Sequence, residues 1–230
     1  MNSMKSELDG ERLQLLDHWA KRFKKNPDWI SNKLLQVREI CLSSNGDEQA
    51  QRSLKSRLRQ FHDKLGFKAK QSLQKGGLCA GAIFRTQAFI ETKQRSGAKG
   101  AGKNVHIEHT FPVNKLEAAI KECHFRDYTE TLTWLFKHSV ATAFHEHEQD
   151  HLSDRTRASD ALVQSSAEYM KPFLRYERLH GAAGIVWNVF DGQEVHPNRF
   201  TFEDHLEIVT RLLEEAGAAR TMISAIRNCS

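Results

Sequence analysis

The 230-residue chain is long enough to bury a substantial core, and its 39% hydrophobic and 27% charged residues are typical of a globular protein and not of a disordered one. No run approaches the roughly 20 apolar residues that a membrane-spanning helix needs, and the polar segment 1–11 does not resemble a signal peptide. The four cysteines are far apart, which disfavours a disulfide framework and a cysteine-based zinc site; they are Cys41, Cys79, Cys123 and Cys229. We therefore expect a cytoplasmic protein with no membrane association.

Positive charge is concentrated in one part of the chain. Residues 52–103 contain thirteen lysines and arginines but only two acidic residues, so this segment carries a net charge of +11. Residues 1–51 are balanced, and residues 104–230 carry −6, for a total of +5. A basic segment of this density is typical of a protein that binds a polyanion, because each contacted phosphate releases condensed counterions.

Three helices are predicted before residue 66, at 8–24, 28–42 and 47–65, separated by Asn26-Pro27 and by the Ser43–Gly46 turn. The third is amphipathic. Its apolar stripe consists of Leu54, Leu58, Phe61 and Leu65. Its basic face consists of Arg52, Lys55 and Arg59, which could lie along a phosphate backbone or form an ordinary helix surface.

The pattern then changes to short strands. Residues 82–90 and 104–111 predict two strands of a hairpin, connected by the glycine-rich basic loop 95–103. Asn114 can cap a short helix that follows. Further predictions are a helix at 132–137, a strand at 138–144, a helix at 145–152, a hairpin with an Asp191-Gly192 turn, and a helix that starts at Thr201–Asp204 and ends near Gly217.

The segment 106–113 (HIEHTFPV) is the most informative for function. Side chains alternate along a strand, so Glu108 and His109 face opposite ways. A carboxylate beside a histidine at a strand end lets one group hold a metal while the other removes a proton from water. Glu108-His109, with Pro112 three residues on, resembles the HNH (ββα-metal) nucleases, in which a strand ends in such a pair.

The resemblance implies a role for each matching residue. Glu108 would be a metal ligand, His109 the general base, and Asn114 the family's central asparagine. A following helix would supply the remaining metal ligand, for which the candidates are His145, His147, Gln149 and His151. The implied cofactor is a divalent ion (Mg²⁺, Mn²⁺ or Zn²⁺), and the implied reaction is hydrolysis of DNA phosphodiester bonds by a restriction-type or phage-defence endonuclease.

With the resemblance, the sequence predicts an α+β fold in three regions. Residues 1–76 would be a helical, basic, DNA-contacting region, residues 77–155 a ββα-metal-like nuclease module, and residues 156–230 a mixed C-terminal extension. The partner would be double-stranded DNA, and a homodimer would suit the cutting of both strands. The residues expected to contact DNA are Arg52, Lys55, Arg59, Arg85, Arg95, Lys99 and Lys103.

Two other functions fit parts of the same sequence. His147-Glu148-x-x-His151 matches the HExxH pattern of zinc peptidases, although the polar Gln149 and Asp150 do not suit the buried helix of such enzymes. A non-catalytic nucleic-acid-binding protein would explain the charge alone. A third pattern, Arg175 to His180, resembles the Rx4H spacing of HEPN ribonucleases, but Arg175 could equally contact phosphate or support the core.

Overall fold

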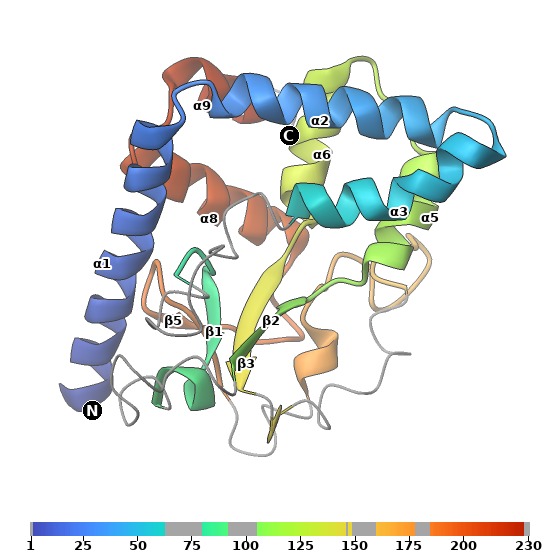
Figure 1. Cartoon of the computed structure of the whole chain (residues 1–230). Helices are drawn as coiled ribbons and strands as arrows, with labels where there is room; N and C mark the ends of the chain where they lie inside the picture. The colour runs from blue at the N-terminus through green and yellow to red at the C-terminus, as the bar shows by residue number, and fades with distance from the viewer. Residues whose placement is uncertain are drawn as a thin grey trace.

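The chain has an α+β fold in which a helical N-terminal region precedes a five-stranded mixed sheet (Figure 1). In the computed structural model the described residues are 2–62, 80–91, 105–145, 147–148, 160–177 and 185–227. None of the helices within these ranges combines the length and hydrophobicity that crossing a bilayer requires.

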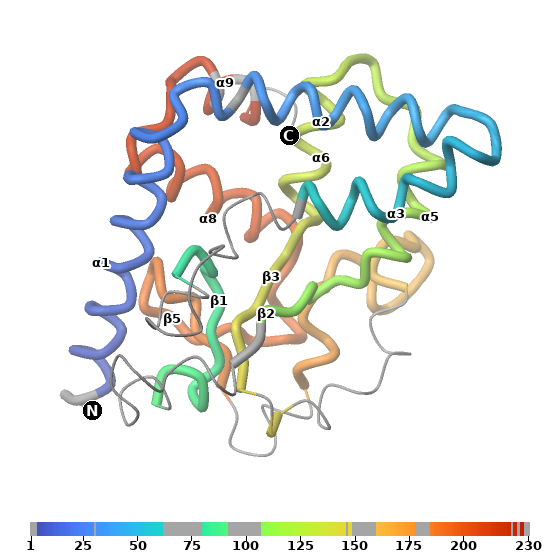
Figure 2. Tube along the Cα trace, in the orientation of Figure 1, coloured from blue at the N-terminus to red at the C-terminus, as the bar shows by residue number. Residues whose placement is uncertain are grey.

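The N-terminal region contains the three predicted helices, α1 (Asn2–Lys25), α2 (Trp29–Ser44) and α3 (Glu48–His62). Pro27 lies between α1 and α2, where it prevents one continuous helix. Gly46 lies in the tight α2–α3 turn, where an added Cβ would be only 2.5 Å from the Cβ of Ala50. The turn makes α2 and α3 neighbours, and in Figure 2 α2 crosses the top of the molecule with α3 beneath it, while α1 runs down the left side.

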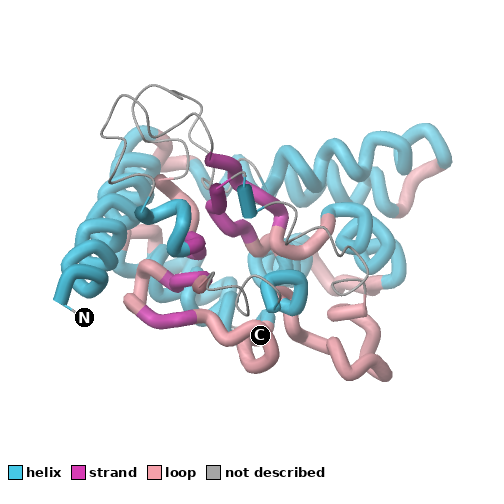
Figure 3. Tube along the Cα trace, turned by 90° about the horizontal axis from the view of Figure 1, so that it is seen from below, coloured by secondary structure: helices cyan, strands magenta, loops and turns pink. Residues whose placement is uncertain are grey.

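The sheet has the strand order β2-β3-β1-β4-β5. Its strands are β1 (Phe84–Thr86), β2 (Val105–His109), β3 (Ala141–His145), β4 (Val186–Asn188) and β5 (Gln193–Glu194). β1 pairs with β3 in parallel, and the other neighbours are antiparallel. The strands lie in the middle of the view in Figure 3, with helices on several sides.

The predicted hairpin between residues 82–90 and 104–111 is wrong, because β3 lies between β1 and β2. β3 is the more apolar partner, with Ala141–Phe144 buried, so it occupies a central position. Residues 87–91 are helical, and a short apolar run cannot by itself distinguish a strand from a buried helix. β1 and β2 therefore do not form the hairpin that a ββα-metal module requires before its helix.

Further helices of the described residues are α5 (Val113–Glu122), α6 (Tyr128–His138), α8 (Phe202–Glu215) and α9 (Arg220–Arg227). The predicted helix start at Thr201–Asp204 is confirmed, and it forms a capping box in which Thr201 and Asp204 each satisfy the other's backbone N–H. Gly217, with φ of 85°, follows the end of α8. By contrast, α6 extends through His138, which was predicted to begin a strand.

A buried hydrophobic cluster runs from Leu8 on α1 to Ile226 on α9, across both predicted region boundaries. Arg85 on β1 is fully buried within it and forms an ion pair with Glu11 of α1. Arg85 also donates to two backbone carbonyl oxygens, those of Ala80 and Ala82. This pair fixes α1 against the sheet.

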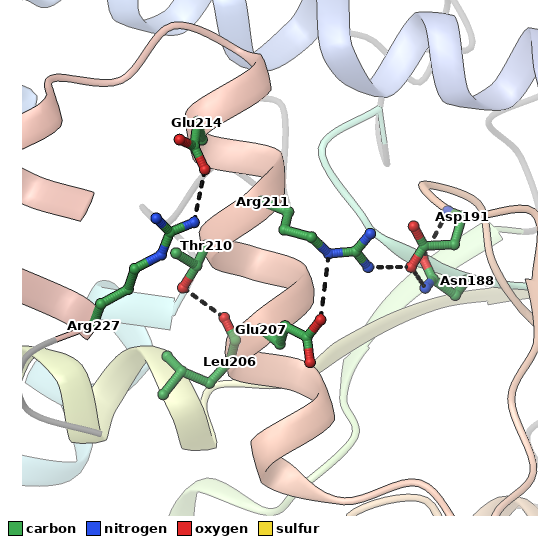
Figure 4. A network of polar contacts seen from close by, with 8 residues as sticks. All are labelled: Asn188, Asp191, Leu206, Glu207, Thr210, Arg211, Glu214 and Arg227. Carbon is green, nitrogen blue, oxygen red and sulfur yellow. Dashed lines mark hydrogen bonds and ion pairs between the residues drawn. The ribbon is translucent and has the colours of Figure 1, made fainter. Parts of the chain in front are cut away.

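Polar contacts fix the C-terminal elements around α8 (Figure 4). Arg211 of α8 donates to Asp191 of the β4–β5 turn at 2.6 Å, and Asn188 donates to the same carboxylate oxygen at 2.8 Å. On α9, Arg227 donates to Glu214 at 2.7 Å. The hairpin and α9 are thus both joined to α8.

Candidate functional site

The side chains of Glu108 and His109 lie on opposite faces of the sheet near the end of β2. In the pairing with β3, Glu108 is opposite Thr142 and His109 is opposite Ala141. Directly opposed residues share a face, so Glu108 lies on the same face as Thr142, and His109 lies on the other. The two groups therefore have separate environments.

Glu108 is bound by two residues of the 3-10 turn η3 (Leu174–Tyr176). The Nη2 atom of Arg175 lies 2.7 Å from Oε1 of Glu108, and the Tyr176 hydroxyl donates to Oε2 over a longer 3.4 Å. The side chain of Arg175 is only 8% exposed and that of Glu108 is 22% exposed. To act as the predicted metal ligand, Glu108 would have to exchange this arginine for the ion.

Hydroxyl groups complete the surroundings of Glu108. Thr110 and Thr142 share a hydrogen bond of 2.7 Å, and both also interact with the buried Tyr176 hydroxyl. Burial, and then the negative charge of Glu108, raise the pKa of Tyr176 well above its usual value. Tyr176 is therefore a neutral donor here, and the group as a whole joins the 174–176 turn to β2 and β3.

One ring nitrogen of His109, the predicted general base, is enclosed by the protein. Its Nε2 atom is shut off from solvent, although the side chain as a whole is half-buried. A general base must reach the water whose proton it removes. With Nε2 enclosed and Glu108 on the other face, this conformation does not bring the two predicted roles together, and the general-base role of His109 stays a prediction.

His145 and His147 come together at the other end of the β2–β3 pair. His145 is the last residue of β3 and is opposite Val105, while residues 147–148 form a 3-10 turn, so His145 does not lie on the predicted helix. The two imidazole centroids are 4.4 Å apart, and the two Nδ1 atoms are 2.5 Å apart. His145 is half-buried and His147 is exposed.

Glu148, the predicted base of the HExxH pattern, is only 2% exposed. Its Oε2 accepts hydrogen bonds from the Thr86 hydroxyl at 2.6 Å and from the backbone N–H of His145 at 2.9 Å. A carboxylate used in this way holds the chain in place and is not available to a substrate. His151, the last residue of the pattern, lies outside the described residues.

The predicted metal site that joins Glu108 to the histidines is wrong for His145. Glu108 is opposite Thr142, three residues before His145, which corresponds to about 10 Å along the strand and to opposite faces. Within the described ranges, no three histidine, cysteine or acidic side chains are grouped closely enough to hold a metal ion.

Asn114 does not cap α5. Pro112 is the N-cap residue and makes no side-chain hydrogen bond, because proline has no polar side-chain atom to offer. Asn114 is exposed in the first turn, on α5 and not on β2. It lies on the helix that follows Glu108-His109.

The predicted DNA-contacting residues divide into three groups. The DNA contact predicted for Arg85 is wrong, because its side chain is fully buried and paired with Glu11. Arg95, Lys99 and Lys103 lie outside the described residues. The basic face of α3 is exposed as predicted, at Arg52, Lys55 and Arg59, while Leu54, Leu58 and Phe61 are buried beneath it.

A cavity of about 270 Å³ lies beside α8 and the β4–β5 hairpin. Four carboxylates line it, and Arg211 is the only cation among its lining residues. The carboxylates are Asp191, Glu194, Asp204 and Glu207. Excess negative charge makes this cavity unsuited to a phosphate-bearing ligand.

Sequence patterns did not reveal the partners of Glu108. Tyr176 and Thr142 belong to no sequence motif, and Arg175 belongs only to the Rx4H pattern that it forms with His180. The Arg175–Glu108 pair joins residues 67 positions apart, which no local period can indicate. The exposed basic face of α3, in contrast, could be predicted directly from helical spacing.

Comparison with known proteins found no match for this chain. No family model, no curated protein and no solved structure matches it.

Proposed function

We propose that the chain binds double-stranded DNA through the phosphate backbone, with the basic face of α3 (Arg52, Lys55 and Arg59) as part of the contact surface. The exposure of all three side chains above a buried apolar stripe supports this proposal. They also belong to the segment with a net charge of +11. Contacts to phosphate carry no sequence information, so this binding would be independent of sequence.

The dimensions of the basic face suit a phosphate backbone. The three residues are spaced by three and then four positions, which spans about 10 Å along the helix axis. Duplex DNA presents one negative charge per roughly 1.7 Å of its axis, so several phosphates lie within that length. Arg52 is paired with Glu48 at 2.8 Å, but both side chains are highly exposed, at 74% and 84%. Such a pair is worth at most about 1 kcal/mol, and Arg52 can exchange it for phosphate.

A salt titration tests the proposal. We expect a variant with Arg52, Lys55 and Arg59 all changed to alanine to bind a 20-base-pair duplex more weakly, measured by fluorescence anisotropy between 50 and 200 mM salt. Each lost phosphate contact lowers the slope of log K against log salt by about 0.9, so the slope should fall by two to three.

The matched control changes three exposed, ion-paired cations elsewhere, Lys21, Arg126 and Arg227, to alanine. Its net charge equals that of the α3 variant, so a purely global charge effect would be the same in both. If the two variants lose affinity equally, or if neither does, the basic face of α3 is not the contact surface.

Metal-dependent hydrolysis of the bound DNA is the second candidate. The convergence of His145 and His147 favours it, since imidazoles that face one another can hold an ion. A bound metal would supply charge stabilisation at a phosphate oxygen. Plasmid incubation with Mg²⁺, Mn²⁺ or Zn²⁺ should then show cleavage by the unaltered protein and none by His147→Ala. An intact plasmid with every metal, together with salt-sensitive binding, would leave binding as the function.

A further inference from the structure

We infer that His145 and His147 form a binding site for a divalent transition-metal ion. The site is on the opposite strand end from the Glu108–Arg175 pair, and it does not depend on DNA binding by α3.

The geometry of the two rings carries this inference. β3 ends at His145, and the 3-10 turn that follows brings the ring of His147 back to within 4.4 Å of the first ring. Their Nδ1 atoms are directed at each other over 2.5 Å. In this arrangement the two rings share one proton as an Nδ1–H···Nδ1 hydrogen bond, and the backbone N–H of His147 also donates to Nδ1 of His145 at 3.3 Å. A metal ion would bind in place of the shared proton, because both are electrophiles that neutral imidazole nitrogen accepts.

The backbone around the pair is held in place before any ion binds. The N–H of His145 donates to Glu148 at 2.9 Å, and the Thr86 hydroxyl of β1 donates to the same oxygen at 2.6 Å. Glu148 is 2% exposed, so this anchor is part of the protein interior. The chain is therefore fixed on both sides of the pair, which lowers the entropy that an ion must overcome on binding.

An ion would displace the shared proton and the 3.3 Å contact from the His147 backbone N–H to Nδ1 of His145, and the two rings would separate slightly. Metal–nitrogen distances of about 2.0–2.1 Å in a tetrahedral site place two ligand nitrogens about 3.3 Å apart. The Nδ1 atoms must then separate by less than about 1 Å from their present 2.5 Å. His147 is exposed, so its ring can make this movement without disturbing the core.

The ligand type selects the metal. Imidazole nitrogen suits Zn²⁺, Ni²⁺ and Cu²⁺, whereas Mg²⁺ prefers oxygen ligands. Because the described residues contain no group of three potential ligands, we expect weaker binding than at a structural zinc site.

Isothermal titration of tag-free, metal-free protein with Zn²⁺, and separately with Mg²⁺, tests the inference. The unaltered protein should bind one Zn²⁺ at this site and no Mg²⁺, and His147→Ala should bind Zn²⁺ at least tenfold more weakly. His124→Ala is the matched control, since His124 is also exposed but lies after α5, away from the pair. It should bind Zn²⁺ like the unaltered protein.

Nitrogen-15 NMR of the histidine rings gives an independent readout, because Zn²⁺ should shift the Nδ1 signals of both His145 and His147. Equal Zn²⁺ affinity for the unaltered protein and His147→Ala would overturn the inference. So would absence of Zn²⁺ uptake by the unaltered protein, which would mean that the rings share a proton only. Unchanged DNA binding by His147→Ala would separate this result from the α3 proposal.

Discussion

Replacing Arg175 with methionine removes the cation that neutralises Glu108 while keeping most of the side-chain volume. With Arg175 8% and Glu108 22% exposed, the change leaves a largely buried carboxylate with the Tyr176 hydroxyl as a weak contact at 3.4 Å. Removing one partner of a fully buried ion pair costs about 3–5 kcal/mol. Water can reach the exposed part of Glu108, so we expect a smaller loss, about 2–3 kcal/mol.

Urea denaturation followed by circular dichroism and by tryptophan fluorescence measures this loss, and agreement of the two signals checks two-state unfolding. Glu108→Gln and the double variant complete a cycle. We expect the double variant to lose at least about 1 kcal/mol less than the two single losses combined, because the pair is then removed together.

The control for this cycle is Arg126→Met, whose partner Glu130 lies at 3.3 Å on the surface and whose own side chain is 78% exposed. It should cost less than about 0.5 kcal/mol. If Arg175→Met is equally mild, or if the cycle is additive, the pair contributes no stability. Glu108 would then be available as a ligand, and the reasoning about its neutralisation would be wrong.

Two other buried groups give measurable expectations. Burial lowers the pKa of His138 to about 3, against about 6.5 in the unfolded chain, so between these values the unfolded state binds more protons and stability falls as the pH falls. From pH 7 to pH 5 the protonation of this histidine in the unfolded chain should lower the free energy of unfolding by about 2 kcal/mol. His138→Phe should lose that part of the pH dependence in urea titrations. Equal pH dependence in the two proteins would contradict this expectation. Arg85→Met should cost about 3–5 kcal/mol in the same assay, because Glu11 remains buried without its partner, and a loss as small as that of a surface pair would show that Glu11 is readily solvated.

Elements with strong local signals were predicted well. The helices α1, α2 and α3 were each placed within a few residues at most ends, since a proline, a glycine turn and a clear apolar stripe mark them. The start of α8 at Thr201 follows from side chains that are adjacent in sequence. For the same reason the exposed basic face of α3 needed only helical spacing.

Strand pairing could not be predicted in this way. Residues 82–90 and 104–111 looked like hairpin partners because they are close in sequence, but the more apolar β3 pairs with both. Arg85 was predicted as a DNA contact together with other cations of the basic segment. Its burial depends on an ion pair with Glu11, 74 residues away, which a local pattern cannot indicate.

The sequence by itself determined the class of fold, the N-terminal helices and the location of the positive charge, because each depends on residues within a few turns of one another. Only the tertiary structure decided what the chemically active side chains face. Glu108 meets Arg175, and His145 meets His147 beyond the end of a strand instead of along a helix. Such contacts depend on which strands pair and in which register, and a shift of one residue would turn every side chain of β2 to the other face.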